Sequence, residues 1–441
     1  MKNVLIIGAG RSASSLIKYL LQHSASLNIT VTVADITLAL AEQKINKHPN
    51  GKAVAFDVTN KEQRENEITK ATVVVSMLPA SLHFLVAKDC LRLKKNLVTA
   101  SYVSKEIESL DADVRKAGIL FLNECGLDPG IDHMSAMKII HEIQNEGGKI
   151  ISFKSYCGGL VAPEYNDNPW GYKFTWNPRN VVLAGQGTAQ YIEDNCYKYI
   201  PYNRLFTQTE KIFFEGIGEL EAYANRDSLS YRNPYGLNDI PTILRGTLRM
   251  PGYCKAWNAF VRLGLTDDTY KIKDAEKLTY YQLLEAFLPN SKKNIQENLA
   301  DFLEEKTDSE VMQKLAWLGI FEKKLIRLSD VSPAQILQDL LEKKWLLKPH
   351  DKDMIVTQHQ FEYVKGAEKK HITSSLMVKG EDQTYTAMAK TVGLPMAIAV
   401  KLILTDQIKH RGIAIPIYPE IYNPILAELA SMEIKFVEKF S

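Results

Sequence analysis

The sequence predicts an α/β protein: a Rossmann-type domain with a parallel sheet, followed by a mixed α/β domain that contains an all-helical insertion. Three observations support this fold class. Apolar runs alternate with helical patterns over the first 125 residues, a glycine-rich turn follows the first run, and the composition changes at about residues 127 and 268. A chain of 441 residues is also long enough for two or three domains.

The first predicted strand and the turn after it carry a dinucleotide-binding fingerprint. Residues 4–7 (VLII) form an apolar, β-branched run, and the turn GAGRSA leads directly into a helical pattern. Gly8 permits a tight turn, Gly10 lets the backbone approach a pyrophosphate, and Ala13 lets the helix lie close to the strand. The predicted cofactor-binding residues of this turn are Gly8, Gly10, Arg11, Ser12 and Ala13.

Asp35 ends the second predicted strand, about 20 residues beyond the glycine turn. At that position a carboxylate accepts hydrogen bonds from both hydroxyls of the adenosine ribose. The same charge would repel a 2′-phosphate, and Ile36 and Thr37 follow where an arginine could have bound one. The pattern therefore predicts NAD as cofactor, with NADP as the second choice. The alternative, a chance glycine turn with a surface aspartate, does not explain the strand, turn and helix in sequence.

Four more strands are predicted before residue 125, and the residues at their carboxyl ends are cofactor candidates. Ligands of doubly wound sheets bind beyond these ends, because all the strands point the same way. Asp57 could reach the adenine amino group, and the loop at Leu78 would pass the nicotinamide ribose. The same topology places Ser101-Tyr102 and residues 126–128 at the cleft. The candidates from these strand ends are Asp57, Val58, Leu78 and Ala100.

The predicted domain boundaries follow the changes of pattern along the chain. Residues 1–126 form the Rossmann domain, completed by about 384–441, an apolar helical segment with an internal Gly-Leu-Pro break. Residues 127–267 and 347–383 form the α/β substrate domain. Residues 268–346, which are rich in Leu, Glu, Lys and Gln and poor in Gly, form the helical insertion.

Residues 126–133 read GLDPGIDH and combine a turn with a helix start. Pro129 and Gly130 fix the backbone, so the carboxylate of Asp128 can point into the cleft and act as an acid or base. Either Asp128 or Asp132 could instead cap the helix, since Asp is a favoured N-cap residue. Both roles are compatible, with Asp132 as the cap and Asp128 at the site. His133 is a second-choice acid–base group.

Tyr102 and Cys157 are the other acid–base candidates. A strand at about 149–160 would deliver Cys157 into a turn at Gly158-Gly159, although a small buried cysteine is the default interpretation. Two arginine clusters, NRD at 225–227 and RGTLR at 245–249, suit bidentate binding of carboxylates and hence a substrate with several of them. For any one of these arginines alone, a surface ion pair is the simpler explanation.

The composition excludes several classes of protein. A formal net charge of +2 gives no electrostatic basis for binding nucleic acid or an acidic membrane. The five cysteines form no CxxC pair, which favours a reducing compartment and argues against a structural metal site. The apolar run at residues 4–7 is too short for a secretion signal, and no clean apolar stretch of ~18 residues predicts a membrane helix. We expect a cytoplasmic protein without a metal.

Several longer motifs are more specific than any of these signals. The segments SYVS, GLDPGIDHM, SYCGGLVAPE, NPWGYKFTW, NRDS, RGTLR and AMAKTVGLP occur in this order over nearly the whole chain. Together they resemble the glutamate-forming saccharopine dehydrogenases, or saccharopine reductases, and the homologous half of the bifunctional aminoadipate-semialdehyde synthases. The resemblance implies the three-part architecture above, with a substrate and dimerisation domain and hence a homodimer.

The resemblance also implies an activity and a set of site residues. The family interconverts saccharopine, NAD(P)⁺ and water with glutamate and 2-aminoadipate 6-semialdehyde. Leu127, Asp128 and Thr175 match residues that line the cofactor and the reacting centre, and Asp128 and Cys157 are both acid–base candidates by position. The matched substrate-binding residues are Ser101, Tyr102, Asp128, Arg226, Arg245, Gly246 and Thr247. Fungal relatives that use NADP have an arginine just after the second strand, so Asp35-Ile36 departs from them and favours NAD and the lysine-degrading direction.

Three rival functions are less consistent with the sequence. A carboxynorspermidine dehydrogenase shares the fold and cofactor, but its polyamine substrate would call for acidic side chains where this chain has arginines. A catalytically silent NAD-binding regulator would be expected to lack Asp128, Tyr102 or the arginines, and all are present. The lysine-forming saccharopine dehydrogenases do not share the layout of these motifs.

Overall fold

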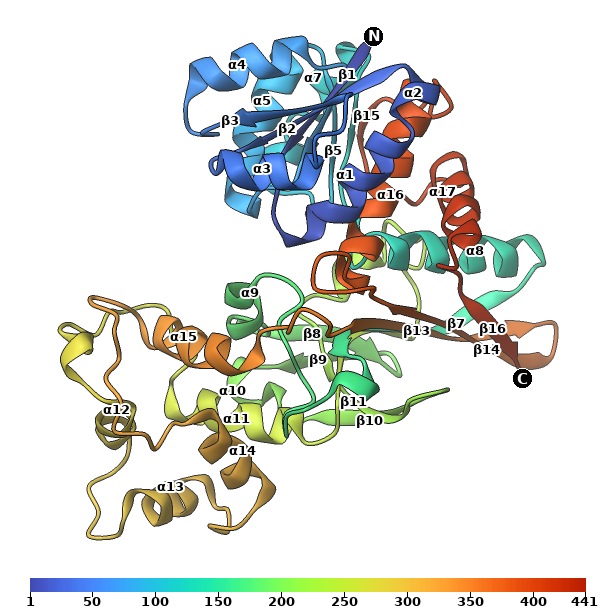
Figure 1. Cartoon of the computed structure of the whole chain (residues 1–441). Coiled ribbons are helices and arrows are strands. Elements are labelled where there is room, and N and C mark those ends of the chain that lie inside the picture. The colour runs from blue at the N-terminus through green and yellow to red at the C-terminus, as the bar shows by residue number, and fades with distance from the viewer. The chain divides into compact units, whose positions relative to one another are not determined.

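The computed structural model describes all 441 residues, which form two compact units (Figure 1). Unit 1 comprises Met1–Ile150 and Tyr363–Ser441, and unit 2 comprises Ile151–Glu362. The helix that follows GLDPGIDH lies in unit 1, whereas it was predicted to begin the substrate domain. The predicted helical insertion lies in unit 2 and shares a hydrophobic core with the rest of that unit.

Unit 1 contains a seven-stranded sheet in the order β15-β6-β5-β4-β1-β2-β3. Every neighbouring pair in it is parallel. The order reverses between β1 and β4, which is the arrangement of a Rossmann fold with one added strand. The strands are β1 (Lys2–Ile7), β2 (Ile29–Asp35), β3 (Gly51–Ala55), β4 (Val73–Ser76), β5 (Asn96–Thr99), β6 (Leu120–Leu122) and β15 (Gly412–Ala414).

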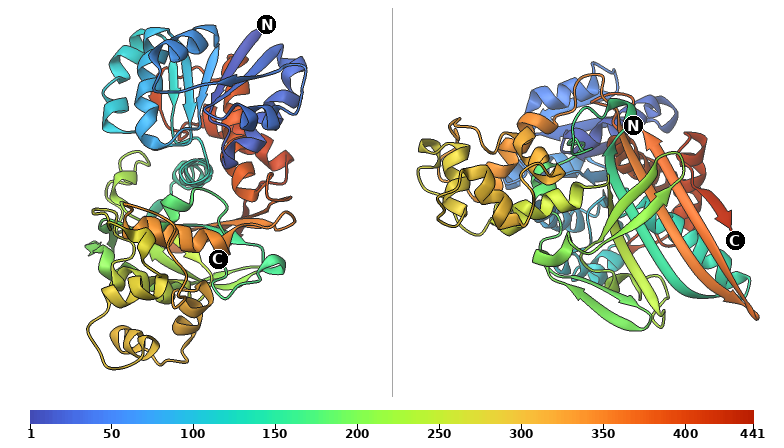
Figure 2. Two further views of the ribbon diagram at one scale, coloured as in Figure 1. Left: turned by 60° about the vertical axis from the view of Figure 1, so that its left-hand side comes forward. Right: turned by 90° about the horizontal axis from the view of Figure 1, so that it is seen from below.

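Helices cover both faces of this sheet (Figure 2). On one face, the apolar side chains of the strands pack against those of α4, α5 and α7 in a continuous buried cluster, whereas α1 and α16 pack against each other and α16 also contacts β4 and β5. The helices are α1 (Ser14–Gln22), α2 (Ser24–Leu27), α3 (Leu38–Ile45), α4 (Lys61–Lys70), α5 (His83–Arg92), α6 (Lys105–Glu108), α7 (Asp111–Lys116), α8 (Ile131–Asn145), α16 (Ala387–Leu404) and α17 (Pro419–Ser431), with single 3₁₀ turns η1 (Arg11–Ala13) and η2 (Ala80–Leu82).

Helix α16 lies unusually close to the phosphate-binding turn. A Cβ atom added to Gly393 would lie 2.8 Å from the amide nitrogen of Leu16 and 3.2 Å from the carbonyl oxygen of Ser12. Only glycine permits this approach, so the C-terminal segment supports the helix that follows the glycine turn. The Gly-Leu-Pro sequence was expected to interrupt the helix; instead α16 runs unbroken from Ala387 to Leu404 with Pro395 inside it. The contacts of α16 with α1, β4 and β5 support a continuous helix through the proline.

Helix α16 is also long and apolar enough to cross a membrane when length and composition alone are considered, contrary to the expectation that no such stretch exists. However, 72% of this 18-residue window is buried inside the structure. A core helix of a globular unit has the same composition because it is surrounded by apolar side chains. Its burial against α1 and the sheet accounts for its hydropathy.

Unit 2 is built on a mixed sheet, in which five strands follow the order β10-β11-β12-β7-β13 (Figure 2). The β12–β7 pair is parallel, whereas β10–β11 and β11–β12 are antiparallel, and the hairpin β8–β9 joins at β12. The strands are β7 (Lys149–Val161), β8 (Ala189–Glu193), β9 (Cys196–Ile200), β10 (Thr209–Phe214), β11 (Gly218–Ala224), β12 (Thr242–Arg249) and β13 (Asp353–Lys365). In unit 1, β14 (Glu368–Lys379) and β16 (Val437–Phe440) form an antiparallel pair.

The helices of unit 2 share one aromatic core. Trp170, Trp257 and Trp345 are each no more than 1% exposed, and the rings of Trp170 and Trp345 pack at 5.3 Å. The helices are α9 (Pro178–Val182), α10 (Tyr202–Leu205), α11 (Tyr253–Leu263), α12 (Tyr280–Phe287), α13 (Ile295–Leu303), α14 (Glu310–Leu318) and α15 (Pro333–Trp345), and the 3₁₀ turns are η3 (Pro163–Tyr165), η4 (Leu229–Tyr231) and η5 (Ala275–Lys277). Residues 268–346 contribute to this shared core.

Strand β7 differs from its prediction. It continues through Gly158 and Gly159 to Val161, where a turn was expected. A Cβ atom on Gly158 would lie 2.8 Å from both Cβ and the carbonyl oxygen of Leu248 in the neighbouring β12. The glycine therefore permits a close approach of two strands and does not mark the end of one.

Candidate functional site

The glycine turn and Asp35 form a connected structure at the carboxyl edge of the unit 1 sheet. The backbone N–H of Gly8 donates to the carbonyl of Ala34 at 2.8 Å. One carboxylate oxygen of Asp35 accepts the N–H of Ala9 at 2.7 Å, and the other accepts the N–H of Thr37 at 2.9 Å. Each oxygen keeps a further acceptor site, so Asp35 can hold the turn and still accept hydrogen bonds from a ribose.

The turn also has the shape that a dinucleotide needs. Gly8 has a φ of +107°, and a Cβ atom there would lie 3.0 Å from the carbonyl oxygen of Met77. A Cβ atom on Gly10 would meet nothing within 4 Å, so the space beside this backbone is open. Arg11 is exposed, Ser12 is half-buried, and Ala13 is buried where the turn becomes a helix. These residues fit a pyrophosphate, as the sequence predicts.

Asp57 and Val58 lie beyond the end of β3, which stops two residues earlier than expected, at Ala55. The exposed carboxylate of Asp57 accepts hydrogen bonds from the N–H of Thr59 at 2.8 Å and from its hydroxyl at 2.7 Å, and these bonds lower the pKa of Asp57. The buried guanidinium of Arg64 donates to the carbonyl of Val58 at 2.7 Å and pairs with Asp89 at 2.8 Å. The loop is therefore held in place before any nucleotide binds.

The loops that follow β5 and β6 lie side by side. A Cβ atom on Gly126 would be 2.8 Å from Cβ of Ala100, and the N–H of Glu124 donates to the carbonyl of Ser101 at 3.0 Å. The carboxylate of Glu124 accepts the N–H of Val103 at 3.0 Å and contacts the ring of His133 at 2.8 Å. Sequence reasoning missed Glu124, and it left His133 as a second-choice catalyst. Both are buried side chains that fix the Ser101-Tyr102 loop.

Residues 126–130 form a closed turn that presents Asp128. The N–H of Gly126 donates to the carbonyl of Pro129 at 3.0 Å, and the N–H of Ile131 donates back to the carbonyl of Gly126 at 2.9 Å. Gly130, with a φ of +149°, is the N-cap of α8, so neither aspartate is the cap as was expected. Instead Asp132, in the first turn, accepts the N–H of Gly130 at 2.6 Å. Asp128 is half-buried, whereas Leu127 is buried.

A second group of candidates lies on neighbouring strands of unit 2. Cys157 on β7 and Thr247 on β12 are direct partners in the parallel register. The hydroxyl of Thr357 on β13 donates to the sulfur of Cys157 at 3.4 Å, so the thiol is packed between two strands. Gly246 permits β12 to lie close to β7, because a Cβ atom there would lie 2.7 Å from the ring of Tyr156.

The two predicted carboxylate-binding arginines leave the sheet close to each other. The N–H of Asn225 donates to the carbonyl of Arg245 at 2.7 Å, which joins the end of β11 to β12 one residue before Arg226. Arg226 is exposed. Arg245 is 5% exposed, and its guanidinium lies 4.0 Å from the ring centre of Tyr231. Arg245 is therefore a buried arginine and not part of the exposed surface, whereas Arg226 lies at the surface.

Thr175 lies in a different loop of unit 2. It is 1% exposed, and its hydroxyl has no hydrogen-bond partner within the protein. The preceding residue, Phe174, donates its N–H to the carbonyl of Trp345 at 2.7 Å. The buried ammonium of Lys173 pairs with Asp351 at 2.6 Å and with Asp167 at 2.7 Å, and it donates to the carbonyl of Tyr165 at 3.2 Å. These contacts fix the loop that carries Thr175.

Replacing Lys173 by methionine is expected to destabilise unit 2 by about 3–5 kcal/mol, because the buried carboxylate of Asp351 loses its charge partner. Chemical denaturation followed by tryptophan fluorescence reports on unit 2 alone, since all five tryptophans lie in it. Lys348→Met is the matched control. Its side chain is 67% exposed and pairs with the same Asp167, so we expect a loss of about 0–1 kcal/mol. Equal losses in the two variants would contradict this account.

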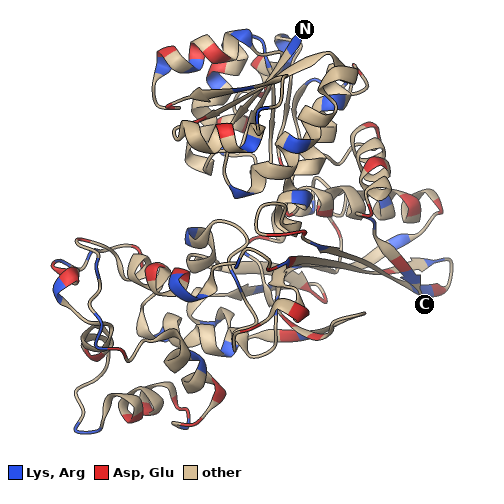
Figure 3. Ribbon diagram, in the orientation of Figure 1, with Lys and Arg blue, Asp and Glu red and all other residues tan.

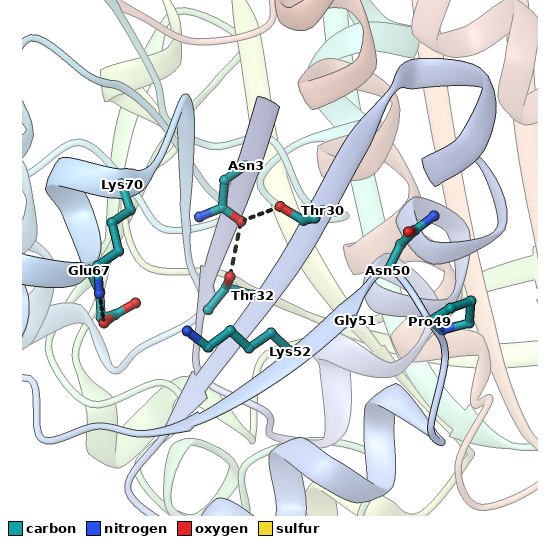
Figure 4. A pocket seen from close by; sticks show the side chains of 9 residues that line it. All are labelled: Asn3, Thr30, Thr32, Pro49, Asn50, Gly51, Lys52, Glu67 and Lys70. Carbon is teal, nitrogen blue, oxygen red and sulfur yellow. Dashed lines mark hydrogen bonds and ion pairs between the residues drawn. The ribbon is translucent and has the colours of Figure 1, made fainter. Parts of the chain in front are cut away.

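A pocket away from these two groups lies in unit 1. An open pocket at the amino ends of β1 to β3 is lined by Asn3, Thr30, Thr32, Lys52 and Glu67 among others (Figure 4). The pocket lies at the edge of the sheet opposite the glycine turn. Its polar groups already bond to one another: the side-chain oxygen of Asn3 accepts hydrogen bonds from the hydroxyls of Thr30 and Thr32.

Lysines, arginines and acids are intermixed along the helices of both units (Figure 3). No group of three His, Cys, Asp or Glu side chains could hold a metal ion.

Comparisons with known proteins match both units. The family model described as "Saccharopine dehydrogenase NADP binding domain" matches residues 4–122, and "Saccharopine dehydrogenase C-terminal domain" matches residues 126–434. The chain is 36% identical to the "Saccharopine dehydrogenase [NADP(+), L-glutamate-forming]" of Saccharomyces cerevisiae, over 97% of this chain and 96% of the yeast protein.

Two further similarities agree with these matches. The chain is 36% identical to the mitochondrial alpha-aminoadipic semialdehyde synthase of Rattus norvegicus over 99% of its own length, but it spans only 47% of that protein. The solved apo structure of the histidine-tagged saccharopine dehydrogenase (L-Glu forming) from S. cerevisiae superposes with a TM-score of 0.90, at 34% identity and with 100% of both chains covered.

Proposed function

Because this chain belongs to the saccharopine dehydrogenase family of oxidoreductases, we propose that it is a glutamate-forming saccharopine dehydrogenase. The proposed reaction converts saccharopine, NAD and water into L-glutamate, 2-aminoadipate 6-semialdehyde and NADH. The observation that carries the proposal is the similarity to the yeast protein over the full length of both chains. Similarity to a relative over the nucleotide-binding unit alone would not indicate which substrate is bound, because many oxidoreductases with different substrates share that fold.

Saccharopine has three carboxylates and a secondary amine, and the candidate residues suit these groups. Arg226 and Arg245 would bind carboxylates, and the hydroxyl of Thr247 would donate to one of them. Ser101 and Tyr102 would supply further hydroxyl donors from the loop that Glu124 and His133 hold in place.

The base in the proposed reaction is Asp128. The secondary amine must lose a proton before the adjacent carbon can give up hydride, and Asp128 would accept that proton directly or through water. The nicotinamide, when bound, supplies the hydride acceptor. Water then adds to the resulting imine carbon of the substrate, and Asp128 returns a proton as the adduct separates into semialdehyde and glutamate. The half-buried position of Asp128 on a closed turn keeps its carboxylate in one place. Tyr102 and Cys157 are the alternative acid–base groups.

We favour NAD over NADP as the cofactor, although the yeast relatives are named as NADP(+) enzymes. Asp35 lies at the end of β2 with both carboxylate oxygens already oriented, and Ile36 beside it is 78% exposed. A carboxylate followed by an apolar residue offers hydrogen-bond acceptors to a ribose and no positive charge to a 2′-phosphate. The lysine-degrading direction, a homodimer and a cytoplasmic location remain predictions.

The first experiment is to follow reduced nicotinamide by absorbance with purified protein, saccharopine and either NAD or NADP. Rapid reduction of NAD, with glutamate appearing in equal amount, is the expected result. Reduction of NADP alone would retain the reaction but contradict the interpretation of Asp35. Tight nucleotide binding without any reduction would overturn the proposed substrate and direct attention to a related secondary amine.

A further inference from the structure

Three side chains of unit 1 form a hydrogen-bonded chain that ends at the candidate substrate-binding residue Ser101. The hydroxyl of Ser76, the last residue of β4, lies 2.8 Å from Nδ1 of His83, the first residue of α5. Nε2 of the same ring lies 2.7 Å from the hydroxyl of Ser101. Ser76 is 1% exposed and His83 2% exposed. Sequence patterns do not reveal this connection, because Ser76 lies in β4, His83 lies in α5 and Ser101 follows β5.

The direction of the hydrogen bonds follows from the surroundings of Ser76. Its hydroxyl is buried, and Nδ1 of His83 is its only partner. If Nδ1 carried the proton, the hydroxyl hydrogen of Ser76 would have no acceptor, at a cost of about 1–3 kcal/mol. Ser76 must therefore donate to Nδ1. A neutral imidazole has one donor and one acceptor, so Nε2 carries the proton and donates to Ser101.

A protonated ring would break this arrangement, because both of its nitrogens would then be donors. Burial lowers the pKa of His83 to about 4, and no charged neighbour contributes to the shift. The ring is consequently neutral at pH 7. A neutral ring agrees with the hydrogen-bond direction derived above, in which Ser76 donates to Nδ1 and Nε2 donates to Ser101.

We propose that His83 is a positioning residue that makes Ser101 a hydrogen-bond donor to the substrate. Since the oxygen of Ser101 accepts from Nε2, its own hydroxyl hydrogen is left for another acceptor, and a substrate carboxylate is an acceptor with no hydrogen to give. Without His83, the hydroxyl of Ser101 can rotate to other acceptors. The identity of the bound group rests on the proposed function, whereas the direction of the chain does not.

The tautomer is the first part of the test, and it needs no enzyme activity. A long-range ¹H–¹⁵N correlation spectrum of the full chain with ¹⁵N-labelled histidine distinguishes the two neutral tautomers, and His83→Gln identifies the signal of His83. The expected result is a neutral ring with the proton on Nε2 at pH 7. A proton on Nδ1, or a charged ring at pH 7, would overturn the proposal whatever the enzyme's substrate is.

The second part compares two substitutions of His83. The amide of His83→Gln can still donate to Ser101, whereas His83→Leu fills the space without a donor. For His83→Leu we expect KM for saccharopine to rise on the order of tenfold, with kcat changed less than threefold and NAD binding unchanged, as one hydrogen bond to a charged group is lost. His83→Gln should restore most of the difference.

Other outcomes are equally decisive. Equal KM values for the two variants, or a fall in kcat and NAD affinity together, would show that His83 acts only through packing. If the wild-type protein does not oxidise saccharopine while the Nε2–H tautomer is observed, the proposed function fails but the hydrogen-bond chain stands, and Ser101 donates to a different anion.

Discussion

Replacing Asp128 by asparagine is expected to lower kcat for saccharopine oxidation by a factor on the order of 10²–10⁴, the usual contribution of a positioned general base. Asparagine has nearly the same shape but cannot accept a proton, so the substrate amine keeps its proton and hydride transfer is blocked. NAD binding should change little, because the glycine turn and Asp35 are untouched. Steady-state absorbance of NADH measures kcat, and nucleotide titration measures binding.

Asp113→Asn is the matched control, since it makes the same chemical change at an exposed acid on α7 of the same unit. Its kcat should equal that of the wild type. Cys157→Ala separates the other candidate base: we expect less than a tenfold loss, because its thiol is packed between strands and hydrogen-bonded to Thr357. If Asp128→Asn keeps a tenth of the wild-type kcat while Cys157→Ala loses nearly all of it, the roles of the two residues are reversed.

The second large effect concerns the choice of cofactor at Asp35. The wild-type protein should prefer NAD to NADP in kcat/KM, and the double variant Asp35→Ser with Ile36→Arg should move this preference toward NADP by a factor on the order of 10²–10³. Removal of the carboxylate ends its repulsion of the 2′-phosphate, and the arginine adds hydrogen bonds to a charged group, each worth about 1.5–3 kcal/mol. Parallel initial-rate measurements with both cofactors give the ratio.

Ile36→Arg alone is the informative control. With Asp35 still present, the new guanidinium has a carboxylate beside it and should pair with that instead of a phosphate, so the change in preference should be smaller. Asp35 also accepts the N–H of Ala9, so Asp35→Ser should weaken the binding of both cofactors somewhat. A wild-type preference for NADP would mean that a cation elsewhere, such as the exposed Arg11, receives the 2′-phosphate.

The sequence predicted those features that depend on local pattern. The apolar run VLII, the glycine turn and Asp35 identified a Rossmann sheet, and the structure has these residues in β1, the following turn and the end of β2. At the site, topology alone placed the loops after β5 and β6 together, and the close approach of Ala100 to Gly126 agrees with this.

Features that depend on contacts between distant residues were not predictable. Gly158-Gly159 looked like a turn, because a glycine pair has the same sequence whether it bends a strand or admits a neighbour such as Leu248. The break expected near Pro395 ignored the packing that keeps α16 continuous. Glu124 and His83 were overlooked as supports of the site, since their partners, Val103 and Ser101, lie 21 and 18 positions away in the chain.

The make-up of unit 1 from two separate segments sets an order on protein synthesis. When the ribosome has completed residue 362, unit 2 has its entire chain, whereas the nucleotide-binding sheet still lacks β15, and α1 lacks the helix that packs against it at Gly393. Translation of the intervening, roughly 200 residues at ~5–20 residues per second takes on the order of 10–40 s. During that interval the first segment exposes apolar surface that only α16 can cover. Within this chain, unit 1 therefore receives its first residues before unit 2 and its last residues after it.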